Sequence, residues 1–277
     1  MLRNLTLVGA VLLFSFAAAA QTSTGVLQGR ITDASGAAVT QAKVTIQNED
    51  TGVAQMVMSN GEGNFSQSYL LPGNYVVTVE KTGFTKYVTA HIRVDVDESP
   101  NLDVHLSVGE VSSTVEVTAT GTLLSTASAT LNTVIDSKPI LDLPNNGRNP
   151  ISMVALTPGV INSTGSYTPW MSGGRNATNE ITVDGTSIIL PENNVSINTT
   201  GFMPVLDSVE EIAVVTNSLA AEYGRTGGGT INMATKGGTN TLHGSGYDYL
   251  QNSVLNANSW ANNKNGAVKS PYQQNTC

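Results

Sequence analysis

The sequence is poorest in the residues that cross-link a chain or hold a metal. Its 277 residues include one cysteine, Cys277, at the last position, so an internal disulfide is excluded and a hydrophobic core must stabilise any folded domain. The three histidines, His91, His105 and His243, lie far apart and lack the cysteine–histidine spacing of a metal site. We therefore expect neither a metal nor a cofactor.

Basic residues are also scarce. The chain has 13 Lys and Arg against 21 Asp and Glu, a net charge of −8, which argues against nucleic-acid binding because that function usually needs a basic face. Charged residues of both signs make up only 12% of the chain, while Gly, Thr, Ser, Asn and Val are abundant. This composition is typical of short strands and turns rather than of long helices.

Long apolar runs are rare as well. Residues 1–20 combine Arg3 with an apolar run at 5–16 and end in alanines, a pattern that predicts a signal peptide cleaved between Ala20 and Gln21. The run is shorter than the about 18 to 20 apolar residues that a spanning helix needs, and no later segment reaches that length. We therefore expect the protein to be exported.

Residues 25–108 alternate apolar and polar side chains in short runs, each ending in a turn signal such as Pro72-Gly73. The pattern predicts strands at 26–32, 42–48, 55–59, 64–70, 74–80, 87–94 and 102–107. Strands at this spacing indicate a β-sandwich.

The turn residues of this region also follow a family pattern. In order they are Gly29, Asp33, Gly36, Ala42, Val44, Ser59, Asn60, Gly63, Phe65, Leu71-Pro72-Gly73-x-Tyr75 and Gly83-Phe84. The segment resembles the carboxypeptidase regulatory-like domain, a family of transthyretin-like, immunoglobulin-like sandwiches. The resemblance implies an accessory module rather than a peptidase, and relatives of the family include carbohydrate-binding modules.

Two binding sites are possible within this region. Oxygen-bearing side chains at alternate positions from Asp95 to Asp103 copy a calcium loop, but Pro100 and Leu106 replace its glycine and its bidentate acid. The polar face of a strand and its turn explains the same spacing, and we prefer that interpretation. A carbohydrate site needs an aromatic platform, for which the candidates are Tyr69, Tyr75, Phe84 and Tyr87.

Residues 109–121 form a β-prone linker with little charge. It is either the last strand of the sandwich, a plain tether, or a donor strand that adds to the open sheet edge of another protein. Its position resembles the TonB box of outer-membrane active transporters, with which a periplasmic energy-coupling protein pairs. The resemblance assigns that contact to Val115, Glu116, Val117, Thr118 and Ala119.

Distinctive phrases follow from about residue 122. An amphipathic stretch at 134–144 is broken by prolines, and Gly147-Arg148-Asn149 precedes a predicted short helix at 151–157. Further phrases lie at 172–185, 208–215 and 221–225, and Asp184-Gly185 predicts a hairpin turn. In this order they resemble the plug domain of TonB-dependent outer-membrane receptors, up to about residue 238. The resemblance implies a mixed α+β domain inside a barrel.

The glycines Gly227, Gly228 and Gly229 do not fit a phosphate loop. Such a loop needs Lys after its last glycine, where this chain has Thr230, and a dinucleotide loop opens a helix, whereas 231–235 alternates like a strand. We predict a structural turn in which positive φ and close backbone approach require glycine. The resemblance implies that this turn leads into a central strand of the plug.

The resemblance also implies contacts between plug and barrel wall. Charged residues at similar places in the family hold the two together; here they are Arg148, Arg175, Glu210, Glu211 and Arg225. The alternative is that they lie on a solvated face.

A plug of this family needs a barrel of about 22 strands. Residues 243–250 alternate and carry tyrosines, so they are a candidate first barrel strand, while 251–277 is polar and rich in Asn. The expected order is signal peptide 1–20, sandwich 21–108, linker 109–121, plug 122–240, and strand with tail 241–277. The fold class is mainly β with a mixed α+β plug, and the C-terminal barrel is expected to be missing or truncated.

These features predict the N-terminal part of an energy-coupled receptor at the outer membrane, exposed to the periplasm, whose plug gates substrate uptake. Its expected partners are a TonB-type energy-coupling protein, its own or a missing C-terminal barrel, the outer membrane, and a glycan or peptide substrate. The alternative is a periplasmic or secreted module that binds carbohydrate or protein. The sequence holds no Gly-x-Ser-x-Gly or His-Glu-x-x-His motif, and we expect no enzyme activity.

Overall fold

The computed structural model describes residues 23–109, 114–118, 130–143, 148–162, 169–175, 178–189, 202–217, 223–224 and 226–276. Several predicted positions are not among these residues. The signal peptide with its Ala20–Gln21 cleavage site, Ala119 and Arg225 lie outside the described residues. The chain divides into two units, 1–238 and 239–277, and the first unit contains two hydrophobic cores.

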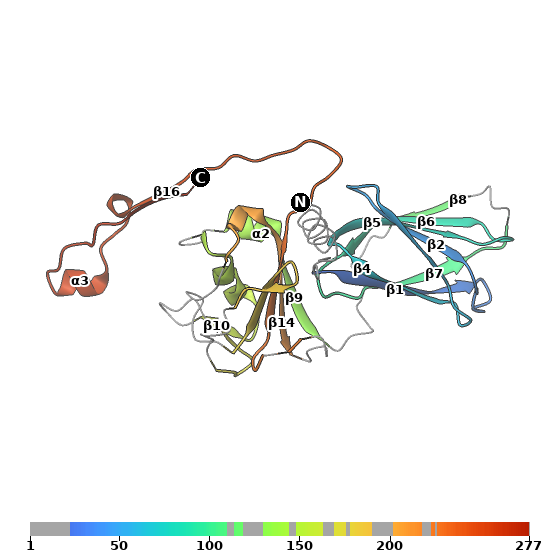
Figure 1. Cartoon of the computed structure of the whole chain (residues 1–277), viewed down its shortest axis with the longest axis horizontal. Helices are drawn as coiled ribbons and strands as arrows, with labels where there is room; N and C mark the ends of the chain where they lie inside the picture. The colour runs from blue at the N-terminus through green and yellow to red at the C-terminus, as the bar shows by residue number, and fades with distance from the viewer. Residues whose placement is uncertain are drawn as a thin grey trace, which may run out of the picture. The chain divides into compact units, whose positions relative to one another are not determined.

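The first core belongs to a β-sandwich at the N-terminal end of the chain. One sheet contains, in order, β4 (Asn64–Leu70), β1 (Gly25–Asp33) and β7 (Asn101–Leu106). The other contains, in order, β3 (Ala54–Met58), β2 (Lys43–Asn48), β5 (Gly73–Glu80), β6 (Lys86–Val94) and β8 (Thr114–Thr118). Figure 1 shows the two sheets as separate layers, coloured blue to green.

Alternation explains why these segments pair as they do. In β5, Tyr75, Val77 and Val79 are buried while the residues between them are half-buried, as strand pleating requires. Each predicted strand is present, with its ends within one residue of the predicted bounds. The predicted β-sandwich is therefore confirmed.

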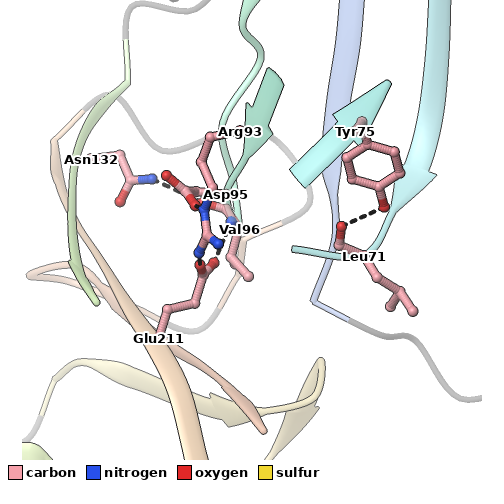
Figure 2. A network of polar contacts seen from close by, with 7 residues as sticks. All are labelled: Leu71, Tyr75, Arg93, Asp95, Val96, Asn132 and Glu211. Carbon is pink, nitrogen blue, oxygen red and sulfur yellow. Dashed lines mark hydrogen bonds and ion pairs between the residues drawn. The ribbon is translucent and has the colours of Figure 1, made fainter. Parts of the chain in front are cut away.

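Two family residues have clear structural reasons. A Cβ on Gly29 would lie 2.0 Å from the carbonyl oxygen of Leu102, so only glycine lets β1 and β7 approach this closely. The buried ring of Tyr75 carries a hydroxyl that donates to the carbonyl oxygen of Leu71 at 2.7 Å, which fixes the turn before β5 (Figure 2).

The second core belongs to a mixed-sheet domain. Its sheet contains, in order, β13 (Thr186–Ser187), β12 (Glu180–Val183), β15 (Thr230–Thr235), β14 (Val209–Asn217) and β9 (Leu131–Asp136). Only β12 and β15 pair in parallel, and β15 is the central strand, as the sequence predicted. Figure 1 shows β9 and β14 side by side within this domain.

Short elements cover one face of this sheet. They are α2 (Ser137–Asp142), η3 (Pro150–Leu156), η5 (Leu206–Ser208) and the hairpin of β10 (Val160–Asn162) with β11 (Pro169–Met171). The predicted short helix is present as the 3₁₀ helix η3, whose N-cap Asn149 accepts the N–H of Ile151 at 3.0 Å. The turn between β12 and β13 has positive φ at Asp184 and Gly185, which confirms the predicted hairpin turn.

The second unit, residues 239–277, holds β16 (Tyr249–Asn252), η6 (Ser253–Leu255), α3 (Trp260–Lys264) and β17 (Gln273–Thr276). The strand predicted at 243–250 is wrong for residues 243–248, because backbone pairing with β17 begins only at Tyr249. Among the described residues, no helix is long and apolar enough to cross a membrane.

Candidate functional site

The predicted donor strand lies on the edge of the sandwich. Its first residues form β8, which pairs in parallel with β6, from Lys86 opposite Thr114 to Ala90 opposite Thr118. This segment is therefore the last strand of the sandwich, which was one of the three predicted possibilities. Since β8 ends the sheet order, no described strand pairs with its other edge. A role as donor strand stays a prediction.

The four predicted plug–barrel charges that the structure describes do not share a single environment, and Arg225 lies outside the described residues. Arg148 pairs with Asp207 at 2.8 Å within the mixed-sheet domain, and both side chains are largely buried. Arg175 is exposed and Glu210 is half-buried, whereas Glu211 is completely buried. Contact with a barrel stays a prediction for all of these residues.

The glycine loop confirms one half of its prediction. A Cβ on Gly229 would lie 2.5 Å from the carbonyl oxygen of Val215, and one on Gly228 would lie 2.5 Å from the side-chain oxygen of Asn179. The close approach is therefore real. The prediction of positive φ is wrong, because Gly227, Gly228 and Gly229 all lie outside that region. The glycines serve packing between β15 and its neighbours rather than a left-handed turn.

The aromatic platform expected for a carbohydrate site is not assembled. Tyr75 is buried and Tyr69 is 80% exposed, while Phe84 and Tyr87 pack against the sandwich core. Buried Tyr75 is therefore not available as a platform, and carbohydrate binding by the sandwich stays a prediction.

The calcium-like carboxylates instead meet protein donors. Asp95 accepts from the guanidinium of Arg93, and Asp97 accepts from Tyr223 and Asn232 of the mixed-sheet domain. Among the described residues, no group of His, Cys, Asp and Glu side chains is arranged to hold a metal. The loop after β6 is thus turned toward the second domain.

Glu211 is the centre of this contact between the two domains. It is 0% exposed on β14, and one carboxylate oxygen accepts from Arg93 Nη2 at 2.9 Å. The other oxygen accepts the backbone N–H of Val96 at 2.5 Å, while the carbonyl of Val96 accepts from Asn132 Nδ2 on β9 at 3.0 Å. Figure 2 shows Arg93 and Val96 converging on the Glu211 carboxylate. Both backbone groups of Val96 are therefore satisfied by side chains of the sheet.

Burial governs the ionisation of this group. It raises the pKa of Glu211 to about 8, and the neighbouring Asp95 adds to the rise, whereas the N–H of Val96 and the charge of Arg93 oppose it. Burial lowers the pKa of Arg93, but Asp95, Glu211 and Asp136 outweigh it, so the pKa ends above its ordinary value. Burying a carboxylate with one half-buried cationic partner is costly, so ionisation of Glu211 disfavours the contact between the two domains.

A second branch of the contact is centred on Asp97. Its carboxylate accepts from the hydroxyl of Tyr223 and the amide of Asn232 on β15, and the Asn232 side-chain oxygen accepts from Thr182 at 2.7 Å. The sequence analysis singled out Glu211 but missed Arg93, Val96, Asn132 and the Asp97 branch. One signal was present: an acidic residue inside the apolar run 209–215 needs a partner from elsewhere.

Two protein families match this chain, one in its N-terminal part and one at its C-terminal end. Residues 26–107 match the carboxypeptidase regulatory-like domain family. The sandwich is such a domain. Residues 234–277 match the outer membrane beta barrel domain family.

The chain is also similar to a curated protein, the TonB-dependent transporter Oar of Myxococcus xanthus. The two are 28% identical over 247 residues, which cover 86% of this chain and 22% of that protein. The chain therefore spans about a fifth of the length of this relative. Together the three matches support a TonB-dependent receptor-like protein.

Solved structures resemble part of the chain only. A hydroxyquinol 1,2-dioxygenase of Pseudomonas putida aligns with a TM-score of 0.28 and 11% identity, over 33% of this chain and 58% of that one. The minor pilin GBS52 of Streptococcus agalactiae aligns with a TM-score of 0.26 and 12% identity, over 32% and 47%. These scores are too low to carry an argument.

Proposed function

We propose that the chain is the N-terminal part of a TonB-dependent outer-membrane receptor that takes up a substrate. The observation that carries the proposal is the order of its parts: a carboxypeptidase regulatory-like sandwich, a small mixed sheet, and a barrel-family match that starts at residue 234. The similarity to a TonB-dependent transporter over 86% of the chain supports the same order. In this proposal the signal peptide 1–20 exports the chain, and the sandwich faces the periplasm.

In this proposal the mixed-sheet domain is the plug that gates uptake. Its central strand β15 ends at Thr235, and the barrel-family match begins at residue 234. The central strand of the sheet is therefore the one that leads directly into the region of the barrel-family match. A rearrangement of the sheet is then transmitted to the barrel along the backbone. The proposed contacts with the barrel wall are Arg148, Arg175, Glu210 and Arg225, because the fifth charged residue, Glu211, is buried against the sandwich.

The donor strand of the proposal is β8. An energy-coupling protein of the TonB type adds a strand to its second edge, where main-chain hydrogen bonds supply affinity without a demanding side-chain sequence. The pairing of β8 with β6 holds the segment extended before the partner binds. Less conformational entropy is then lost when the partner binds. No bond chemistry is part of the proposal, and the chain acts as a receptor rather than an enzyme. We include in this proposal that the substrate taken up is a glycan or a peptide.

The test is uptake by the intact receptor gene that contains this segment. Val117→Pro removes one backbone N–H from β8. Val117→Thr is the matched control, because it also replaces the side chain but keeps the backbone N–H. We expect the proline variant to lose energy-dependent uptake while its outer-membrane level is unchanged, and the threonine variant to retain uptake. Normal uptake by the proline variant would show that β8 is not the coupling strand.

A further inference from the structure

The two cores of the first unit are complete without the residues that join them. The sandwich core spans residues 27–106 but does not include Val96, and the mixed-sheet core does not include Ala213. Instead Val96 forms a separate small cluster with Ala213 and Ala234, against which Val134 packs. The loop of the sandwich at residues 95–97 thus packs on the second face of the sheet at Val134, Ala213 and Ala234.

The apolar part of this contact is small, because a single valine lies on two alanines and part of another valine. The polar part is extensive. Val96 uses both backbone groups, Arg93 reaches Glu211, and Asp97 accepts from Tyr223 and Asn232. Since hydrophobic burial scales with apolar area, charge and hydrogen bonding decide how firmly the domains are joined.

We propose that residues 95–97 form a reversible latch, which holds the sandwich against the β9–β14–β15 face through Glu211 and opens without unfolding either domain. Opening exposes the face of Val134, Ala213 and Ala234 to a new neighbour. The latch does not depend on the transport proposal, because it follows from the contacts alone. It differs from a rigid junction in that its two halves belong to separate cores.

The charges around Glu211 determine when the latch is firm. Arg93 on β6 and Asp95 in the loop face it, Asp136 lies opposite it on β9, and the uncharged Ala234 lies opposite it on β15. In the closed latch the pKa of Glu211 is about 8, above its ordinary value of 4.5. The closed form therefore binds the proton more tightly than the open form. Closure is fully favoured below about pH 4.5 and weakens as the pH rises through 8.

The backbone amide of Val96 is the natural reporter, because it donates to the Glu211 carboxylate across the contact. Hydrogen exchange on the full chain, read residue by residue, compares Val96 with Val77 in the sandwich core. We expect protection of Val96, corrected for intrinsic exchange, to fall by at most about tenfold per pH unit between pH 5 and 8. Val77 stays protected throughout.

Two variants with matched controls make the test decisive. Glu211→Gln keeps an acceptor for Val96 but cannot ionise, so its Val96 protection is expected to be independent of pH; Glu62→Gln, an exposed turn residue, keeps the wild-type pH dependence. Arg93→Gln removes the cation and is expected to lower Val96 protection several-fold above pH 8, whereas the exposed Arg30→Gln does not. Arg93 is half-buried, so this variant remains informative if Glu211→Gln does not fold.

Two results would overturn the latch. The first is exchange of Val96 and Val77 at the same rate, which would mean that the contact opens only when the sandwich unfolds. The second is Val96 protection that neither pH nor Arg93→Gln changes.

Discussion

The sandwich and the mixed-sheet domain differ in where their buried polar groups are. The sandwich buries Ser59 and Thr89, and Ser59 is satisfied locally by the backbone of Val39 and Ala42. Among its described residues, the mixed-sheet domain buries six polar ones: Thr157, Asn179, Glu180, Glu211, Thr230 and Asn232. Glu211 and Asn232 find partners in the sandwich. Ser59 therefore finds its partners within the sandwich, whereas Glu211 and Asn232 of the mixed-sheet domain find partners in the other domain, at Arg93, Val96 and Asp97.

The largest expected effect tests whether each core stands alone. Ile46→Ala removes a fully buried side chain from the sandwich and is expected to destabilise it by about 2–5 kcal/mol. Hydrogen exchange of Val77 in the sandwich should rise accordingly, while Ile231 in the mixed sheet stays protected. Equal loss at both amides would mean that the two cores unfold as one.

The next effect concerns pH and only the contact between the domains. Because the pKa of Glu211 is raised to about 8, its contribution to closure is present at acid pH and is lost as pH rises toward 8. The loss is at most about 1.4 kcal/mol per pH unit. Spin labels are placed at the exposed positions Glu62 and Lys138, and Cys277→Ser avoids a third label. The distribution of distances between the two labels should be broader at pH 9 than at pH 5. A distribution unchanged over that range would contradict the assignment.

A smaller effect is expected at the glycine loop. Gly229→Ala places a Cβ 2.5 Å from the carbonyl oxygen of Val215 and 2.6 Å from the methyl carbon of Met171, so overpacking should cost about 1–3 kcal/mol. Gly224→Ala is the control, since no atom lies within 4 Å of its Cβ position. Chemical denaturation of both variants measures the difference; equal stabilities would show that the loop adjusts freely.

The smallest effect returns to the sandwich. Tyr75→Phe removes the hydrogen bond to Leu71 and should cost about 0.5–1.5 kcal/mol. Tyr69→Phe changes an exposed side chain in the same way and should cost almost nothing. Comparing the melting temperatures of the two variants measures the contribution of the buried Tyr75 hydroxyl to stability. Identical melting temperatures would show that this hydroxyl does not stabilise the turn.

Local signals explain what the sequence predicted well. The strands from β1 to β7 follow alternation and turn residues, and the Asp184-Gly185 hairpin follows from two residues alone. The predicted strand at 243–250 was misplaced because alternation does not show where a partner strand begins. Residue type alone did not reveal which of the four candidate rings is buried, as Tyr75 is, and which is exposed, as Tyr69 is.

The latch was beyond sequence reasoning for a related cause. Arg93 and Glu211 are 118 positions apart, and Asp97 and Asn232 are 135 apart. No periodicity within a strand links such positions, and the contact exists only after both domains have folded. Glu211 was named only as a charge that the resemblance assigns to the barrel wall, and residues 95–103, next to its partner Arg93, were interpreted as the polar face of a strand and its turn.

The register of β8 on β6 decides how the sandwich responds to mechanical tension. Thr118 lies beside Ala90, so β8 leaves the sheet in the direction in which β6 runs toward Arg93 and the latch. Tension applied to Thr118 along the strand axis would load the β6–β8 hydrogen bonds in shear, all together, instead of peeling them apart one after another. A parallel edge strand held in this way resists sudden extension and yields only when the whole ladder slips.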